Sequence, residues 1–318
     1  MTLQELLAKY DEKRNAEERR LAAQEQALFL AHPQLQALQA QKKELILQQL
    51  MAVMQRPGQK EQVQREFAAQ AAELDARMAE YQKQHQVQLP QMAYECPLCQ
   101  DTGYIERQGR REFCACLREQ IYQKVLGGQK IEALEGSFAA FDASIFPDEK
   151  GEGTASQRSR IMAIRSFAEG YCQAFPQNPQ KQLLLMGRPG LGKSYLLACM
   201  CKKLYERERD ICYLGSYALF EQFHKDRLGE GAMLEPVYDA KVLVIDDLGS
   251  EPLTQNVTRE YFFDLLCVRA RAGLHTFMAT NNTYEQLKER YTERVSSRLL
   301  SKKQSLVLRF FGEDLRLL

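Results

Sequence analysis

The stretch from Gly187 to Ser194, G-R-P-G-L-G-K-S, constrains this chain more than any other. It directly follows the apolar run 183–186 and directly precedes the largely apolar segment 195–200. Strand, glycine-rich turn and helix, in that order, form the context in which the pattern G-x-x-x-x-G-K-[ST] makes a phosphate-binding loop. Glycines adopt backbone angles closed to other residues, so successive N–H groups can turn toward an anion. The sequence therefore predicts a nucleoside triphosphate site.

The residues of this loop have distinct expected roles. Lys193 is expected to reach the β- and γ-phosphates, and the hydroxyl of Ser194 to ligate Mg²⁺. The helix that begins at Lys193 directs its positive end toward the same anion. The loop residues expected to contact the nucleotide are Gly187, Pro189, Gly190, Leu191, Gly192, Lys193, Ser194 and Tyr195.

A second element, K-V-L-V-I-D-D, ends in Asp246 and Asp247. Its apolar residues predict a buried strand, and both acids stand at the carboxyl end of that strand. Asp246 is expected to hold hydrated Mg²⁺, and Asp247 to polarise the attacking water. Because aspartate is shorter than the more usual glutamate at the second position, we expect slow, switch-like hydrolysis of ATP to ADP and phosphate.

An amide follows the next apolar run. Residues 274–280 are predicted to form a strand that ends at Asn281, and an amide beside the acidic strand is placed to orient the lytic water. The pair Asn-Asn is also ordinary turn chemistry, which remains the alternative. His275, within this strand, is expected to be a core or edge histidine rather than a catalytic base.

Three arginines follow in the C-terminal part of the chain. Arg294 and Arg298 are four residues apart, so both project from one face of a predicted helix. Such a pair is either solvated surface or, where protomers assemble, an arginine finger for the neighbour's γ-phosphate. Arg316 is a late basic residue able to fold back over the phosphates.

From residue 156 onward, helical and strand patterns alternate. Short apolar strands bounded by helices predict an α/β fold whose parallel, doubly wound sheet is covered on both faces. The nucleotide would then lie at the carboxyl ends of the strands. Strands are expected near residues 182–186, 211–215, 241–246, 274–280 and 305–310.

Residues 1–88 differ from the rest, being rich in Gln, Ala, Glu, Lys, Arg and Leu. Breaks at His32-Pro33 and Pro57-Gly58 divide them into three helical segments. In the third segment, Val63, Phe67, Ala71, Leu74, Met78 and Tyr81 form one apolar stripe. A helical hairpin or coiled-coil-like arm is expected, either as a protein-binding module or as a structural arm. The three segments are 2–31, 34–55 and 60–86.

Four of the nine cysteines are clustered, as Cys96-x-x-Cys99 and Cys114-x-Cys116. Two close pairs that bracket a turn suit tetrahedral thiolate coordination of structural Zn²⁺. An iron–sulfur cluster or a redox dithiol is the alternative, and His85 is a conceivable substitute ligand. The other five are expected to be small, buried apolar residues: Cys172, Cys199, Cys201, Cys212 and Cys267.

The charge of the chain is balanced, with 43 basic and 42 acidic residues, so any nucleic-acid contact must be a local patch. No apolar run approaches the roughly 18 residues that span a membrane, and nothing indicates export. A reduced, cytoplasmic setting without membrane contact is expected.

Taken in order, these blocks resemble bacterial replicative-helicase loaders, the DnaC/DnaI-type AAA+ ATPases. The resemblance covers roughly residues 94–318. It rests on the cysteine block, Phe141-Asp142, the glycine-rich loop, and V-I-D-D-L-G followed by Glu251. It implies an AAA+ fold of the initiator clade with a five-stranded sheet in the order 5-1-4-3-2. It also implies Mg·ATP bound between protomers, affinity for single-stranded DNA, and docking of the N-terminal region on the helicase hexamer.

By position, the resemblance implies roles for single residues. Lys193 and Ser194 match the P-loop, and Asp246 and Asp247 match the Walker B acids. Asn281 is similar to the sensor-1 residue. Arg298 matches the arginine finger, with Arg294 one turn before it, and Arg316 the sensor-2 arginine. The catalytic set is then Lys193, Asp246, Asp247, Asn281 and Arg298.

Single-stranded DNA would be contacted by a local patch. Lys225 and Arg227 follow the second strand, and the aromatic residues Tyr217, Phe220 and Phe223 are available for base stacking. The alternative for these aromatic residues is a place in the core.

We therefore expect an ATP-dependent loader of the replicative helicase, acting in replication initiation or restart. Its rivals are a transposition-associated AAA+ ATPase, which shares the loop and the acidic pair, and a non-catalytic ATP-bound adaptor. The expected domains are a helicase-binding arm (1–88), a zinc module with four cysteine ligands (89–127), a connector (128–155) and an AAA+ domain with a reduced or absent lid (156–318).

Overall fold

A computed structural model describes residues 1–56, 58–107, 109–149, 155–255, 257–301 and 303–317. Pro57, at a predicted helix break, therefore lies outside the described residues, as do residues 150–154 of the predicted connector. The chain divides into two compact units. One comprises residues 8–102, and the other residues 1–7 together with 103–318.

Helices dominate the unit of residues 8–102, and they confirm the three predicted segments. The helices are α1 (Leu3–Ala31), α2 (Pro33–Gln55) and α3 (Lys60–His85). Pro33 at the first position of α2 ends the preceding helix, because proline cannot continue a helix but is tolerated at its start. Leu35, Leu38 and Met78 form the core between α2 and α3. The predicted stripe of α3 is confirmed, since all six of its members are at least partly buried.

The second unit contains the predicted parallel sheet. Its strands occur in the order β4-β5-β6-β3-β7, which is 5-1-4-3-2 when the five are numbered along the chain. All neighbouring strands run parallel. The strands are β3 (Gln182–Met186), β4 (Ile211–Gly215), β5 (Val242–Leu248), β6 (His275–Thr280) and β7 (Ser305–Arg309).

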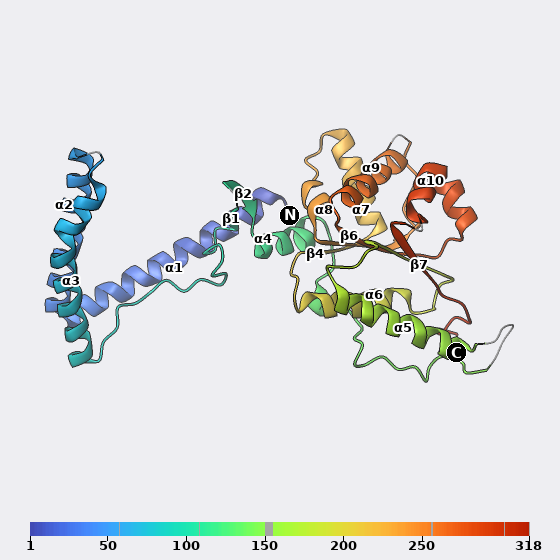
Figure 1. The fold of residues 1–318 in the computed structure, drawn as a ribbon, viewed down its shortest axis with the longest axis horizontal. Coiled ribbons are helices and arrows are strands. Elements are labelled where there is room, and N and C mark those ends of the chain that lie inside the picture. The colour runs from blue at the N-terminus through green and yellow to red at the C-terminus, as the bar shows by residue number, and fades with distance from the viewer. Residues whose placement is uncertain (57, 108, 150–154, 256, 302, 318) are drawn as a thin grey trace. The chain divides into compact units, whose positions relative to one another are not determined.

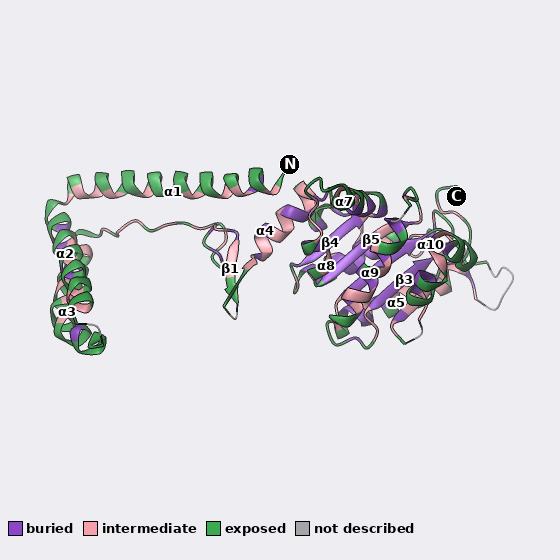
Figure 2. Ribbon diagram, turned by 90° about the horizontal axis from the view of Figure 1, so that it is seen from above, coloured by how far each residue is buried: buried purple, intermediate pink, exposed green. Residues whose placement is uncertain are grey.

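Helices cover both faces of this sheet. In Figure 1, α5 and α6 lie on one face and α7, α9 and α10 on the other. Strands β3, β4, β5 and β6 are buried almost throughout, as Figure 2 shows in purple, which explains why they read as continuous apolar runs, whereas the edge strand β7 is mostly only partly buried. The helices are α5 (Gln157–Ala174), α6 (Lys193–Tyr205), α7 (Ser216–Leu228), α8 (Glu235–Asp239), α9 (Thr258–Arg271) and α10 (Tyr284–Leu299).

A small hairpin, which the sequence patterns do not predict, precedes the sheet. Strands β1 (Tyr104–Arg107) and β2 (Arg110–Phe113) pair antiparallel, and α4 (Ala115–Gln120) follows them. A π-helical turn (Ile121–Val125) and a 3₁₀ turn (Ile131–Ala133) lead toward α5. The hairpin lies between the two predicted cysteine pairs along the chain.

Within the described part of the chain, every helix is too short or too polar to cross a membrane. Four of the isolated cysteines are buried as predicted, namely Cys172, Cys199, Cys201 and Cys212, whereas Cys267 is only partly buried.

Candidate nucleotide-binding site

The glycine-rich loop joins β3 to α6, as predicted. Gly190 and Gly192 have φ angles of +74° and +85°, a backbone region in which side chains are strained. A Cβ at Gly190 would also lie only 1.5 Å from Oδ1 of Asp314. The backbone N–H of Leu315 donates to the Gly190 carbonyl at 3.1 Å. Glycine is therefore needed at Gly190 both for its conformation and for contact with the C-terminal segment.

Lys193 stands at the first position of α6 and is only 7% exposed. Its Nζ donates to the carbonyls of Gly187 at 2.8 Å and Arg188 at 2.7 Å, so the loop itself holds the ammonium beside the glycines. Burial lowers the pKa of Lys193 to about 8, and Asp246 and Asp247 oppose that shift. The N–H groups of the first helical turn have no partners within the helix, so they and the ammonium offer positive charge to the same place.

Asp246 lies at the carboxyl end of β5. Its Oδ1 accepts from the Ser194 hydroxyl at 3.0 Å, and its Oδ2 accepts from the Tyr213 hydroxyl at 2.8 Å. A carboxylate and a hydroxyl oxygen side by side are the hard ligands that Mg²⁺ prefers, usually together with water and phosphate oxygens. The arrangement of Ser194 and Asp246 therefore fits the predicted magnesium site.

Asp247 adopts φ +55°, which is uncommon for a residue other than glycine. Its Oδ1 accepts from the Asn281 amide at 2.9 Å. This contact forms because β6 is the direct neighbour of β5 in the sheet. The amide and the second acid are thus brought together, as required if both act on one water molecule.

These side chains line one cavity of about 720 Å³. The loop, the acidic pair and Asn281 meet there although they come from three separate strand ends. Predicted residues that line it are Pro189, Gly190, Leu191, Gly192, Lys193, Ser194, Tyr195, Asp246, Asp247, Asn281 and Arg316. Gly187 lines an adjacent cleft with Phe310.

The apolar wall of the cavity comes from a segment that was assigned no binding role from its sequence. Phe141, Ile145 and Phe146 line it, all from the stretch that precedes α5. The rings of Phe141 and Phe146 stack with centroids 5.9 Å apart, and Tyr195 of α6 lies 6.0 Å from Phe141. The closely spaced aromatic residues that precede the glycine-rich loop in the sequence are the signal that could have identified this wall. The wall offers flat apolar surface opposite the polar loop, which suits a nucleobase.

Two of the predicted arginines lie away from the cavity. Arg294 and Arg298 stand on α10 and are exposed. The guanidinium of Arg294 lies over the ring of Phe263, 4.6 Å from its centroid. Helix α10 is interrupted at Thr292, where φ is 76° and ψ 164°. Neither arginine lines the cavity of its own protomer.

The residues considered for DNA contact separate into two groups. Phe220 and Phe223 are buried in the core, where Phe220 packs against both Phe223 and Phe262, so base stacking on them is excluded. Tyr217 is 63% exposed, and Lys225 pairs with Glu221 at 2.8 Å. Of the aromatic residues considered, only Tyr217 keeps an accessible ring.

His275 is confirmed as a core histidine. It is 3% exposed, and its ring lies 4.6 Å from that of Phe175. Burial lowers its pKa to about 4, so the imidazole is neutral near pH 7.

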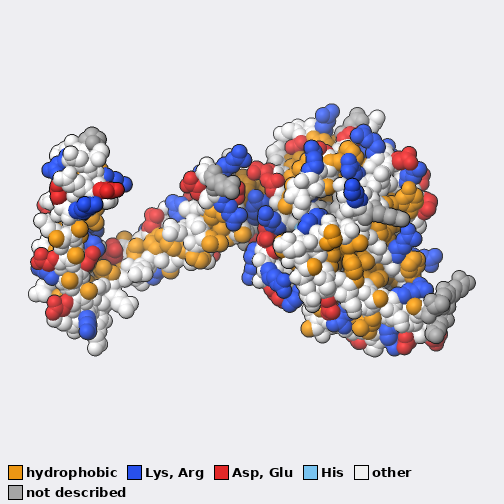
Figure 3. All heavy atoms as spheres, viewed as in Figure 1, with side chains coloured by type: hydrophobic (Ala, Val, Ile, Leu, Met, Phe, Trp, Pro, Cys, Tyr) orange, Lys and Arg blue, Asp and Glu red, His pale blue; other side chains and the backbone are white. Residues whose placement is uncertain are grey.

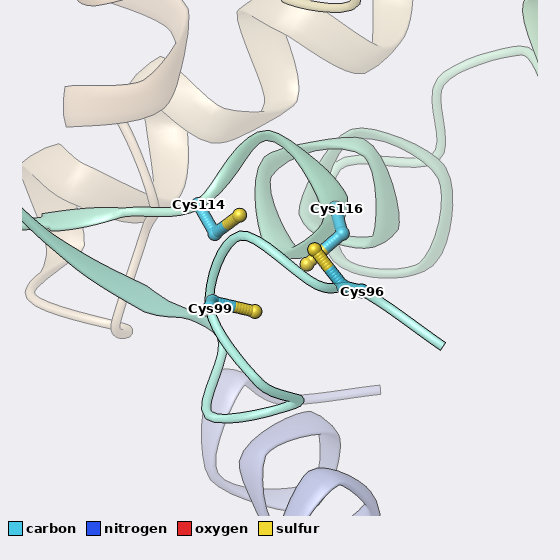
Figure 4. A group of neighbouring side chains, drawn as sticks. All are labelled: Cys96, Cys99, Cys114 and Cys116. Atoms are coloured by element: carbon cyan, nitrogen blue, oxygen red, sulfur yellow. The ribbon is translucent and has the colours of Figure 1, made fainter. Parts of the chain in front are cut away.

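The sulfur atoms of Cys96, Cys99, Cys114 and Cys116 lie within 4.8 Å of one another. Figure 4 shows the four side chains turned toward a common centre. A tetrahedral zinc–thiolate site, with Zn–S distances of about 2.3 Å, places its sulfurs roughly 3.8 Å apart. The cluster is therefore compatible with zinc. His85 is not part of it, because its ring stacks on Tyr81 at 4.2 Å.

The lowered pKa of Lys193 predicts a pH-dependent affinity for Mg·ATP. The unbound protein loses the ammonium charge as pH rises through about 8, whereas bound phosphates favour the protonated lysine. The affinity is expected to be constant near neutral pH and to fall about tenfold per pH unit above pH 8. Titration with a fluorescent ATP analogue measures this, with Lys193→Arg as the control that stays charged. A flat wild-type profile up to pH 9.5 would contradict the prediction.

Comparison with known proteins places these features in context. Residues 163–308 match the protein family described as IstB-like ATP binding protein. The chain is 32% identical over 196 residues to the replicative helicase loader DnaI of Bacillus subtilis (strain 168), a match that covers 60% of this chain and 58% of the relative. It is 25% identical over 143 residues to the replicative helicase loader DnaC of Escherichia coli (strain K12), covering 43% and 57%. The chain thus spans less than three fifths of the length of either relative.

One solved structure, a crystal structure of DnaI, has a TM-score of 0.43 and 27% sequence identity to this chain. The match covers 59% of this chain and 94% of that chain.

Proposed function

We propose that the protein is an ATP-dependent loader of the replicative DNA helicase, built on an AAA+ domain of the IstB/DnaC type. The observation that carries the proposal is the single cavity that joins Lys193 and Ser194 to Asp246, Asp247 and Asn281. Among its similar proteins are two replicative helicase loaders, which makes the helicase the first partner to test.

In this proposal the cavity binds Mg·ATP. The loop amides and Lys193 would hold the phosphates, and Ser194 with Asp246 would hold the metal ion. The wall formed by Phe141 and Phe146 would receive the adenine, and Arg316 would reach the phosphates from the C-terminal segment. Magnesium, when bound, neutralises charge on the phosphates, while Asp247 and Asn281 orient the attacking water. The short Asp247 side chain favours slow hydrolysis.

We propose further that each site is completed by a second protomer. The support is the position of Arg298, which is exposed on α10 and does not line its own cavity. Among the described residues, no carboxylate forms an ion pair with Arg298, so its guanidinium is available to a γ-phosphate across an interface. Arg294, one turn earlier, would contribute to the same interface.

The cysteine cluster is proposed to hold one structural Zn²⁺. Wild-type protein should contain about one zinc per chain by elemental analysis, and Cys99→Ser should lose it, because three thiolates bind far more weakly than four. Hydrogen exchange of residues 94–116 should accelerate in the same variant.

Cys267→Ser, a change at a partly buried cysteine outside the cluster, should keep the metal. Iron and visible absorbance in place of zinc would overturn the assignment in favour of an iron–sulfur cluster.

The helical arm is proposed to bind the helicase. One face of α2 exposes an apolar stripe that we define as Leu47, Leu50, Met51 and Met54, each more than half exposed. Their spacing of i, i+3, i+4 and i+7 places them on one face. Figure 3 shows hydrophobic side chains reaching the surface of the α2–α3 hairpin among charged ones. An exposed apolar stripe of this kind is typical of a protein-binding surface.

Leu50→Glu should weaken binding of the full-length chain to the helicase hexamer by at least about tenfold, because it places a charge in the centre of a desolvated interface. Binding is measured by interferometry with immobilised helicase and ATP, and ATP hydrolysis by the isolated loader should not change. Gln48→Glu adds the same charge on another face of α2 and should bind normally. A wild-type chain that does not bind the helicase would contradict the proposed function.

Affinity for single-stranded DNA is proposed as a weaker property of the AAA+ domain. Tyr217, Lys225 and Arg227 are the candidates, and the affinity should fall steeply with salt if phosphates are contacted.

A transposition-associated AAA+ ATPase is a second candidate. The family match supports this candidate as strongly as it supports a helicase loader. The match covers residues 163–308 and includes neither the helical arm nor the cysteine cluster. Stimulation of ATP hydrolysis by duplex DNA, with no response to the helicase, would identify this alternative.

A further inference from the structure

The turn that follows β5 connects the acidic pair to the remainder of the domain. The carbonyl of Asp247 accepts from the Ser250 N–H at 3.2 Å and from the Ser216 hydroxyl at 2.9 Å. The same residue therefore places its carboxylate in the cavity and closes the turn with its backbone. The Asp247 carbonyl is held by these donors, whereas the Glu251 side chain points toward other partners.

Glu251 ends this turn with a side chain that is 0% exposed. Its Oε2 accepts from the Gly249 N–H at 2.9 Å, and its Oε1 accepts from the Arg290 Nε at 3.3 Å and from the Tyr291 hydroxyl. A buried carboxylate is tolerated only when such donors satisfy it. Glu251 thereby joins the turn after β5 to α10 through a fixed set of contacts.

The point of attachment on α10 lies directly before its interruption. Arg290 and Tyr291 precede Thr292, where the backbone leaves the helical conformation. The ring of Tyr291 is buried against Phe262, 5.3 Å between centroids. The helical segment after the interruption carries Arg294 and Arg298. Glu251 therefore contacts the last two residues before the interruption, after which that segment begins.

We propose that Glu251 is a positioning residue that sets how its own protomer presents Arg298 to the neighbouring protomer. The inference rests on the proposed shared site. Glu251 itself does not line the cavity, so its influence on hydrolysis would act on the neighbour's nucleotide and not on the one bound beside it. Hydrolysis at one site would thus depend on Glu251 of the next protomer.

Mixing two inactive full-length proteins tests this directly. The Lys193→Ala chain has an inactive site but keeps Arg298, so it can act only as the finger donor, the protomer that supplies the arginine. The Arg298→Ala chain lacks that arginine but keeps an intact site, so it is the site donor. In an equal mixture, about one quarter of head-to-tail interfaces combine the intact site with the intact finger, so activity should return to about that fraction of wild type. Glu251→Gln is then added to either chain.

Glu251→Gln in the finger donor should lower the restored activity by at least about tenfold, because a misplacement of roughly 1 Å has such effects. The same change in the site donor should lower it less than about twofold. Affinity for ATP and the melting temperature are measured on every protein. Tyr291→Phe, which removes one donor to the same carboxylate with little change in volume, should repeat the asymmetry and serves if Glu251→Gln does not fold.

Each outcome decides between the two proposals. No restored activity in the plain mixture contradicts the shared site, and the role of Glu251 falls with it. Restored activity that drops equally with Glu251→Gln in either chain, or in neither, leaves the shared site intact and overturns the positioning role.

Discussion

Lys193→Ala is expected to lower kcat/KM for ATP hydrolysis by about 10³-fold. Lys193 is the buried cation at the start of α6, and its Nζ lies within 2.8 Å of two loop carbonyls. Alanine removes the charge that would meet the β- and γ-phosphates as negative charge shifts between them. Single-turnover hydrolysis with excess protein measures the chemical step without the contribution of product release.

A matched control is available on the same helix. Lys203 is exposed and pairs with Glu206 at 2.8 Å, so Lys203→Ala should leave hydrolysis unchanged. Wild-type activity of Lys193→Ala would favour an adaptor that does not use ATP hydrolysis.

Arg269→Met should destabilise the unit that contains the parallel sheet by about 3–5 kcal/mol. Arg269 is fully buried and lies on α9. Its guanidinium donates to the carbonyls of Val237, Tyr238 and His275 and to the Thr276 hydroxyl, at distances from 2.6 to 3.0 Å. Methionine fills a similar volume but leaves these acceptors without a donor. The unfolding midpoint in urea, followed by circular dichroism, measures the loss.

Arg271→Met provides the comparison two residues further along α9. Arg271 is exposed and has one long hydrogen bond, 3.3 Å to the Cys267 carbonyl. Its replacement should change stability by less than about 0.5 kcal/mol. Equal losses in the two variants would show that the acceptors around Arg269 find other partners.

The parallel sheet was predictable because β3, β4, β5 and β6 are largely buried and read as apolar runs. The strands at 182–186 and 211–215 were predicted with their observed bounds. Strand β5 extends past the predicted end at Asp246 to Leu248, since an irregularity in its pairing lets Leu248 stay opposite Thr280 of β6. Such a register shift leaves no mark in apolar periodicity.

Contacts between segments far apart in the sequence explain why three features of the structure could not be predicted. Phe141 and Phe146 reach the cavity because the chain before α5 folds back beside α6, and no local pattern specifies that return. The hairpin of β1 and β2 is short and charged, and its partly buried positions do not alternate with exposed ones. Thr292 interrupts a sequence whose composition is helical on both sides. In each case tertiary packing overrides the local preference.

Part of the cavity is lined by residues that lie outside the segment matched by the family. Phe141 and Phe146 precede the family-matched segment 163–308, and Leu315 and Arg316 follow it, yet all four line the cavity. Gln157 and Glu313 exchange two hydrogen bonds that join these flanks. A fragment trimmed to the matched segment would keep the lysine and the acids but lose both flanks of the pocket. Bound nucleotide would therefore contact the segments on both sides of the matched region and stabilise their association.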